Sequence, residues 1–556
     1  MSQSRFRRPS RREFLKRGAL VTVGAATAIT TTSEVFAAGA GHPVVRTAEG
    51  RLRGASAAGL NIFKGVRYGE DTGGMNRFKP PIPVRPWRGI RDALEVGPPC
   101  PQLHGSGPTA WIDPKPASED CLFLNVWAPR KPGKRAVMVF FHGGGFSSGS
   151  GGRAIHDGGE LAERGNVVVV TVTHRLNIFG YLYLGGVSPQ FADSANLGQQ
   201  DLVAALQWVN RNIAEFGGDP SNVTIFGESG GGGKVSVALA MPSAQGLFTK
   251  AIVESGSSLH LRTKGAAGEE APLVFRELDI PENDSSAIYS VPAERLLAAF
   301  KTVFATGRSA HGSELQHFSP FVDGVVVPAQ PDSLESLRLW KSVPLLVGTN
   351  EAEAAYPYST RPRGIPNPTD DNAVQAELVR SWSATPSQSQ QLVSAYRRRF
   401  PSDTPQQLLV SIATGFWMWQ RANRQAELKA RLGGAPVYVY QFGWKEHVLG
   451  GRWAIHSAEL IFLFDKLDMG SLYDIDNASL ARVKTDPQGL RFRLRDTMIA
   501  SWAAFAKTGN PSSRFVGQWP PFTLAKHETM RLDGHSSLLL DPLGPEIRKL
   551  WDSSTA

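Results

Sequence analysis

The chain contains the sequence Val223-Thr224-Ile225-Phe226-Gly227-Glu228-Ser229-Gly230-Gly231, in which a short apolar run leads directly into a glycine-rich turn. The segment that follows, Val235–Ala240, is compatible with a helix. Glycines two residues before and two residues after a serine let two stretches of backbone pass closely, as a tight turn between a strand and a helix requires. The spacing therefore predicts a nucleophile elbow, a turn that exposes the hydroxyl group of Ser229.

The same glycines also suggest a phosphate-binding loop, because Gly230 to Gly233 precede Lys234. A P-loop needs a glycine at the position of Glu228 and a serine or threonine at the position of Val235. Neither requirement is met, so the sequence does not predict a nucleotide-phosphate site at this turn.

A second glycine-rich loop, His142-Gly143-Gly144-Gly145-Phe146, lies upstream of the serine and follows the apolar run 136–141. Hydrolysis of an ester passes through a tetrahedral oxyanion, which is stabilised by preorganised N–H donors. Consecutive glycines let backbone amides approach such an oxyanion without a side-chain clash. Taken alone, the loop could be a plain flexible turn; beside the elbow, it is interpreted as part of an oxyanion hole.

Strand and helix patterns alternate along the chain. Further apolar runs of strand length are residues 167–172, 344–347 and 437–440, and residues 199–216 have apolar positions spaced three or four apart. Strands that are apolar on both faces and alternate with helices predict an α/β fold with a central, mostly parallel twisted sheet flanked by helices. Residues 263–310 and 355–430 are interpreted as helical insertions over the active site.

The N-terminus has the features of an export signal. Residues Ser10–Lys16 match the twin-arginine pattern through Arg11 and Arg12, and a weakly apolar stretch, Gly18–Thr32, follows. We expect residues 1–40 to be a signal peptide, cleaved within about residues 37–40, and residues 41–556 to be a single domain. The expected partner during export is the twin-arginine translocation machinery, and the expected location is the periplasm or the medium. The apolar stretch is too short for a stable membrane anchor.

The net charge of the chain is +10, and half of this charge lies in the first forty residues. The remainder shows no basic stripe interleaved with aromatic residues, so nucleic-acid binding is not expected. The chain has two cysteines, Cys100 and Cys121. Two thiols cannot form a structural zinc site, and an oxidising compartment favours a single disulfide between them. We expect no metal ion and no organic cofactor.

These motifs resemble those of the carboxylesterase/cholinesterase family, the type-B carboxylesterases of the α/β-hydrolase fold. The most specific segment is Ser118–Trp127, which is similar to the family's E-D-C-L-Y-L-N-V signature with Phe123 in place of tyrosine. Phe216–Pro220 and Trp502–Pro511 also resemble family motifs, and the resemblance extends from about Val44 to Trp551. It implies hydrolysis of small-molecule carboxylic esters, and it implies that Cys100 and Cys121 form the family's N-terminal disulfide.

The resemblance also implies a Ser-Glu-His triad in the chain order Ser229, Glu353, His456. Glu353 stands five residues after Gly348, where the family places its acid, although Glu351 is a competitor two residues earlier. His456 lies in a segment similar to the family's H-G-x-D/E-L motif, with Ser457 in place of glycine.

By the same resemblance, His456 accepts the proton of Ser229 and Glu353 holds the imidazole. The backbone N–H groups of Gly144, Gly145 and Gly230 form the oxyanion hole. Gly230 stands where the family usually has alanine, which predicts extra room beside the acyl group. Because the base must be neutral, kcat/KM is expected to fall as the pH drops through roughly 6 to 7.

Three alternatives remain open at this stage. Trp111 lies where cholinesterases carry a cation-binding tryptophan, although simple packing in the loop before Cys121 is favoured. The family also includes adhesion proteins that have lost catalytic residues, and the complete triad set argues against that role. Amide hydrolysis or acyl transfer would use the same residues, and nothing in the sequence favours either reaction.

Overall fold

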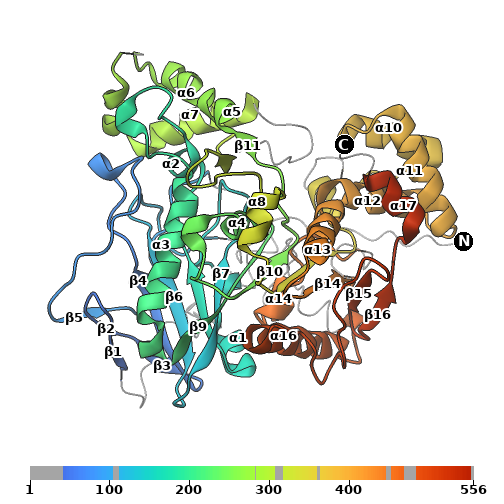
Figure 1. Ribbon diagram of the computed structural model, residues 1–556, viewed down its shortest axis with the longest axis horizontal. Helices are drawn as coiled ribbons and strands as arrows, with labels where there is room; N and C mark the ends of the chain where they lie inside the picture. Colours follow the sequence, from blue (N-terminus) through green and yellow to red (C-terminus); the bar gives the residue numbers. More distant parts are fainter. Residues whose placement is uncertain are drawn as a thin grey trace, which may run out of the picture. The chain divides into compact units, whose positions relative to one another are not determined.

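The described residues of this computed structural model form a central sheet of eleven strands with helices on both sides (Figure 1). The structure describes residues 42–103, 112–281, 283–306, 317–359, 364–445, 453–468 and 484–552. The predicted signal peptide, residues 1–40 with Arg11 and Arg12, lies outside these ranges, and so does Trp111. In the described ranges, no helix is long and apolar enough to cross a membrane.

The α/β fold with a mostly parallel sheet is confirmed. The strands that run parallel to their neighbours are, in sheet order, β8 (Val168–Val172), β7 (Arg135–Phe141), β9 (Gly218–Glu228), β10 (Lys250–Glu254), β13 (Leu345–Asn350), β14 (Val437–Phe442) and β15 (Glu528–Leu532). Antiparallel strands extend both edges of this unit: β6 (Phe123–Pro129), β4 (Leu60–Arg67) and β3 (Ala55–Ala57) at one edge, and β16 (Ser537–Leu540) at the other. The predicted strands all lie within or overlap strands of the parallel unit.

Strand β7 shows how the sheet separates two cores. Val137 and Val139 belong to one cluster of buried residues, whereas Met138 and Phe140 belong to another. Helices α3 (Leu197–Asn212) and α4 (Gly230–Leu239) contribute to the first cluster. Helices α1 (Gly159–Gly165) and α16 (Leu490–Thr508) contribute to the second. Because successive side chains of a strand point to opposite faces, a strand buried on both faces reads as a continuous apolar run.

The register of the parallel strands brings their carboxyl ends together. Gly227 of β9 is paired with Phe141 of β7 on one side and with Val253 of β10 on the other. Glu254, the last residue of β10, is paired with Gly348 of β13. The segments that follow these strands therefore leave the sheet at one edge, where ligands bind in open α/β sheets.

The two segments expected to be insertions are helical. The first contains α5 (Lys264–Gly268), α6 (Glu270–Leu278) and α7 (Ala293–Thr306). The second contains α9 (Ala355–Ser359), α10 (Asp371–Trp382), α11 (Pro386–Arg399), α12 (Pro405–Thr414) and α13 (Gln420–Leu432), with a π-helical turn at Gly415–Trp419. Helices α10 to α12 pack with α17 (Gly544–Asp552) around a buried cluster of their own.

The predicted disulfide is not confirmed, because Cys100 and Cys121 are free thiols in this structure. Both side chains are fully buried. The thiol of Cys121 is hydrogen-bonded to Cys100, and this bond together with burial raises its pKa well above the ordinary value. The backbone N–H of Leu176 donates to Cys100 Sγ over 3.3 Å. The spacing of the cysteines does not reveal that both thiols are shielded from solvent.

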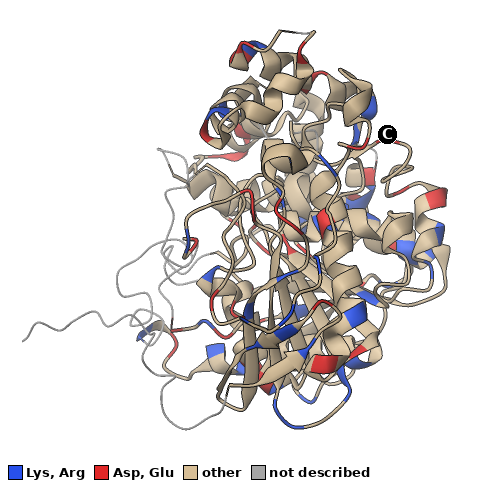
Figure 2. Cartoon of the chain, turned by 90° about the vertical axis from the view of Figure 1, so that its left-hand side faces the viewer, with Lys and Arg blue, Asp and Glu red and all other residues tan. Residues whose placement is uncertain are grey.

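In Figure 2, the Lys and Arg residues and the Asp and Glu residues of the described part of the chain are interspersed. Many of these residues are paired. Arg175 and Asp201 form the most buried of these pairs, with Nη2 and Oδ1 separated by 2.6 Å.

Candidate active site

Ser229 occupies a strained turn between β9 and α4. Its backbone angles are φ 57° and ψ −124°, a conformation that L-residues rarely adopt. The glycines on either side allow the close approach that this turn needs. A Cβ atom on Gly231 would lie 2.0 Å from the carbonyl oxygen of Phe141, and one on Gly227 would lie 2.6 Å from the same oxygen. The predicted strand-turn-helix geometry is therefore present at this serine.

Ser229, His456 and Glu353 form one chain of hydrogen bonds. The Nε2 atom of His456 lies 2.8 Å from Ser229 Oγ, and its Nδ1 atom lies 2.6 Å from Glu353 Oε2. His456 is 4% exposed and Glu353 is fully buried. An imidazole held at Nδ1 by a carboxylate presents Nε2 to the hydroxyl, so this arrangement can take a proton from Ser229.

Glu353 is fixed by further donors to its second oxygen. The backbone N–H of Asn350 donates to Oε1 over 2.7 Å, and the hydroxyl of Ser255 donates to the same atom over 2.5 Å. The competitor Glu351 instead pairs with Arg531, at 3.0 Å. The carboxylate of Glu353 is therefore buried against the imidazole, whereas that of Glu351, two residues earlier, forms a partly exposed ion pair.

A second carboxylate, that of Glu228, lies on the other side of the imidazole. Its Oε1 atom accepts a hydrogen bond from the hydroxyl of Ser457 over 2.5 Å and lies 3.4 Å from His456 Nε2. Ser457 has φ 64°, so this serine adopts the left-handed conformation that the family's glycine would adopt easily. Burial raises the pKa of Glu228 to about 7. The charge of His456 and the hydrogen bond from Ser457 lower this pKa, but their effect is smaller than that of burial.

The electrostatics of His456 follow from these two carboxylates. Burial disfavours the imidazolium form, but the charges of Glu228 and Glu353 and the hydrogen bond to Glu353 outweigh it. The net effect raises the pKa of His456 above its ordinary value. The imidazolium form of His456 is thereby stabilised.

Two more buried carboxylates lie near this chain, and neither was predicted from the sequence. The indole N–H of Trp502 donates to Glu254, and the amide of Asn350 donates to Glu459 Oε2 over 2.5 Å. Burial raises the pKa of Glu254 to about 8 and that of Glu459 well above its ordinary value. Burial therefore favours the neutral form of both carboxyl groups. Glu459 occupies the D/E position of the H-G-x-D/E-L motif that begins at His456, and this position was the sequence signal that could have pointed to it.

Aromatic side chains from the second insertion cover the imidazole. The rings of Trp417 and His456 have centroids 4.7 Å apart, and those of Tyr356 and His456 have centroids 5.7 Å apart. Trp417 belongs to the π-helical turn Gly415–Trp419, a type of turn that is frequent at functional sites. Residues 355–430 therefore contact the hydrogen-bond chain at His456, as the expectation of an insertion over the candidate site requires.

The glycine loop after β7 lies against the elbow. Gly144 and Gly145 have φ 88° and 61°. In the described part of the chain, the N–H groups of Gly144, Gly145 and Gly230 have no protein acceptor. The expected extra room at Gly230 is wrong, because a Cβ atom there would lie 2.2 Å from the carbonyl oxygen of Gly145. The backbone of the glycine loop occupies the space that the methyl group of an alanine would fill at this position.

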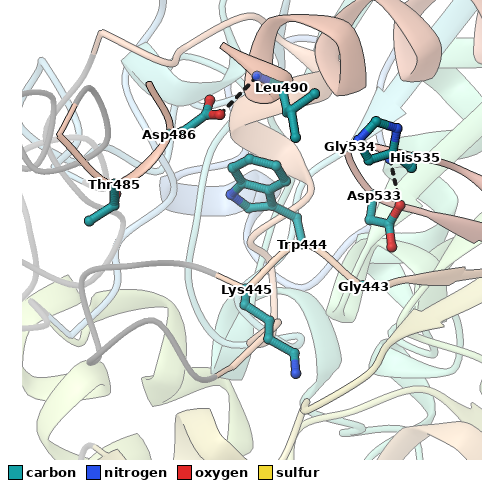
Figure 3. Close-up of a pocket in the computed structure, with 9 residues that line it drawn as sticks. All are labelled: Gly443, Trp444, Lys445, Thr485, Asp486, Leu490, Asp533, Gly534 and His535. Atoms are coloured by element: carbon teal, nitrogen blue, oxygen red, sulfur yellow. Dashed lines mark hydrogen bonds between the residues drawn. The ribbon is translucent and has the colours of Figure 1, made fainter. Parts of the chain in front are cut away.

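A cavity of about 340 Å³ lies elsewhere, beyond the carboxyl ends of β14 and β15 (Figure 3). Trp444 stands between Asp486 and Asp533 in this view, and the cavity is lined by Gly443, Trp444, Lys445, Thr485, Asp486, Leu490, Asp533, Gly534 and His535. None of Ser229, Glu353 and His456 lines it. Its acidic groups accept local bonds, such as the backbone N–H of Leu490 to Asp486 over 2.9 Å.

Comparison with known proteins agrees with this geometry. A model of the carboxylesterase family matches residues 41–543. The chain belongs to the carboxylesterase family. This carboxylesterase is 34% identical over 515 residues to the para-nitrobenzyl esterase of Bacillus subtilis (strain 168), covering 92% of the chain and 99% of that protein.

Solved structures of esterases have the same fold as this carboxylesterase. A PNB esterase structure superposes with a TM-score of 0.78 at 33% identity, covering 92% of this chain and 99% of that chain. A carboxylesterase of Geobacillus stearothermophilus superposes with a TM-score of 0.76 at 33% identity, with coverages of 91% and 99%. The chain is therefore a carboxylic ester hydrolase of the α/β-hydrolase fold and a serine esterase.

Proposed function

We propose that this esterase hydrolyses carboxylic esters through an acyl-enzyme intermediate on Ser229. Neutral His456 takes the hydroxyl proton as Ser229 Oγ attacks the ester carbonyl carbon. The tetrahedral intermediate collapses, the bond to the alkoxy group breaks, and the imidazolium donates its proton to the departing alcohol. Water then repeats the sequence on the acyl-enzyme and releases the acid. Glu353 holds the imidazole in the required tautomer throughout.

Gly144, Gly145 and Gly230 supply the oxyanion hole in this proposal. The N–H groups of these three residues have no acceptor among the described residues, and the glycine loop packs against the nucleophile turn, which supports that role. Hydrogen-bond donors of this kind act where negative charge develops, and loss of one such donor typically costs about 10²–10³ in kcat. The donors are backbone groups, so their position depends on the loop and not on the identity of a side chain.

The single observation that carries the proposal is the hydrogen-bond chain from Ser229 through His456 to Glu353. The test is hydrolysis of p-nitrophenyl esters from acetate to palmitate by purified protein and by Ser229→Ala. We expect turnover by the wild type and none above the uncatalysed rate by the variant. Labelling of Ser229 by an organophosphonate, located by mass spectrometry, identifies the nucleophile. Turnover that survives in Ser229→Ala would refute the proposal.

The aromatic rings over His456 support a preference for esters of aromatic alcohols. His456 donates its proton to the leaving alcohol, so Trp417 and Tyr356 lie beside the expected site of that group. The Bacillus relative is named for para-nitrobenzyl esters. We expect p-nitrobenzyl acetate to be hydrolysed with a higher kcat/KM than ethyl acetate. Acetylthiocholine, compared with a neutral thioester of similar size, tests the alternative of a cation site at Trp111.

Export is proposed from the sequence alone. The pattern around Arg11 and Arg12 supports transport of the folded esterase by the twin-arginine machinery to the periplasm or the medium. Residues 1–40 are the signal peptide in this proposal, and residues 41–556 are the mature domain.

A further inference from the structure

A fully buried lysine, Lys234, contacts both ends of the glycine loop. It lies in α4, five residues after Ser229, and its side chain is 0% exposed. Its Nζ atom donates to the carbonyl oxygen of His142 over 2.8 Å, at the start of the loop. The same Nζ atom lies 5.9 Å from the ring centroid of Phe146, at the end of the loop. The amino group of Lys234 thus contacts the residues immediately before and after the three glycines.

The loop lies along the first turns of α4 between these contacts. A Cβ atom on Gly143 would lie 3.5 Å from Ser229 Cβ, and one on Gly233 would lie 3.2 Å from Phe146 Cζ. The carbonyl of Gly145 packs on Gly230, as described above. The distance from the loop amides to Ser229 is therefore set by how closely the loop is held to the helix.

Lys234 is costly to the fold. Burial lowers its pKa to about 7, and Arg153 adds repulsion that Glu228 partly offsets. Lys234 belongs to none of the ion pairs of the described residues; Arg153 pairs with Asp113, and Glu228 lies beside His456. A buried ammonium without a close counter-ion destabilises a protein, and an apolar residue of similar volume is often tolerated better. Stability alone therefore gives no reason for a lysine at this position.

We propose that Lys234 is a positioning residue for the oxyanion hole, holding the loop 142–146 against α4 so that the amides of Gly144 and Gly145 meet the developing oxyanion. This inference rests on the proposed function of Ser229. It accounts for the lysine that follows the glycine run, which the elbow itself does not require.

The test compares Lys234→Met, which removes the donor but keeps the length, with Lys234→Gln, whose amide can still donate to a carbonyl. Lys429→Met is the matched control. Lys429 is also a buried lysine, and it donates to the carbonyl oxygens of Trp340 and Lys341 over 2.9 and 2.7 Å, away from the glycine loop. Each variant is assayed for kcat and KM on p-nitrophenyl butyrate, and for its thermal unfolding midpoint.

The selective readout is affinity for an aryl trifluoromethyl ketone. Ser229 Oγ adds to its carbonyl carbon, the hydroxyl proton passes to His456, and the resulting hemiketal oxyanion occupies the proposed hole. For Lys234→Met we expect kcat to fall about 10- to 100-fold with KM nearly unchanged, and affinity for the ketone to fall by a similar factor. The unfolding midpoint should stay constant or rise. Lys234→Gln should recover most of the loss, and Lys429→Met should keep the wild-type kcat.

Several results would overturn the inference. A wild-type kcat in Lys234→Met would do so, and so would a lower kcat with unchanged affinity for the ketone. Failure of Lys234→Met to fold, while Lys429→Met folds, would assign Lys234 to stability instead. If Ser229→Ala is inactive but Lys234→Met is fully active, only this inference fails. If Ser229→Ala retains hydrolysis, the proposed function fails as well.

Discussion

At the scale of single residues, the surroundings of His456 set the pH range of the enzyme. Glu228 and Glu353 raise the pKa of the imidazole, and a general base must be neutral to act. We therefore expect kcat/KM to fall with decreasing pH from a midpoint above the ordinary histidine value of about 6.5, higher than the sequence alone implied. The measurement is the pH profile of kcat/KM on a neutral ester.

Glu228→Gln provides the control for this profile. The variant keeps the shape of the side chain but removes its charge, so the pKa of His456 should decrease and the midpoint should move to lower pH. Because Glu228 itself has a pKa of about 7, the wild-type midpoint belongs to the coupled pair and not to one group. A profile that does not move in Glu228→Gln would contradict this account.

The acid of the triad can be tested against its neighbour. Glu353→Gln replaces the acceptor at His456 Nδ1 with an amide, which stabilises the wrong tautomer. By comparison with the same change in other triads, kcat should fall about 10³- to 10⁴-fold. Glu351→Gln, two residues away, removes only the ion pair with Arg531 and should keep kcat within about twofold of the wild type. Equal losses in the two variants would exclude the assignment of Glu353.

Much of this residue-scale picture could be predicted from the sequence, because the elbow, the glycine loop and the histidine segment are local motifs. The burial of Glu254 and Glu459 could not, since it depends on Trp502 and Asn350 from distant segments. The pairing state of Cys100 and Cys121 could not be predicted either. Sequence spacing shows that a bond between the two cysteines is possible, but it does not show that both thiols are free and buried in the structure.

At the scale of elements, the contact between α4 and the glycine loop leaves no space for a methyl group at Gly230. We expect Gly230→Ala to push the loop away from the helix and lower kcat by about 10²-fold, a typical result of a displacement near 1 Å. The affinity for a trifluoromethyl ketone should decrease in parallel. Gly268→Ala is a suitable control, because a Cβ atom there meets nothing within 4 Å.

Several elements could not be predicted from local patterns. Strand β10 is fully buried, but Lys250 and Glu254 at its ends leave only three apolar residues between them. Its position between β9 and β13 stabilises it as a strand. Helix α16 carries three arginines in its first half, Arg491, Arg493 and Arg495, so its buried face is not evident from the sequence. Both elements form because the neighbouring sheet and helices bury them, which is a tertiary effect.

At the scale of the whole molecule, the export proposal predicts where the active enzyme accumulates. Changing Arg11 and Arg12 to lysine should retain the full-length precursor in the cytoplasm, whereas the unchanged chain should yield a shorter form outside it. Fractionation followed by N-terminal sequencing measures both outcomes. Because this machinery carries folded proteins, the retained precursor should still hydrolyse esters. Equal export of both chains would contradict the proposal.

The residues of the candidate active site are far apart in the sequence, which affects how the site forms during folding. Ser229 and His456 lie 227 residues apart, and His456 and Glu353 lie 103 apart, although their side chains are in hydrogen-bond contact. Bringing such distant segments together closes large loops, which slows folding in proteins of high contact order. During refolding from denaturant, recovery of ester hydrolysis should therefore follow recovery of helical circular dichroism. A nascent chain that has not yet reached residue 456 carries its nucleophile without a base, so the cell is exposed to this hydrolase only after synthesis is nearly complete.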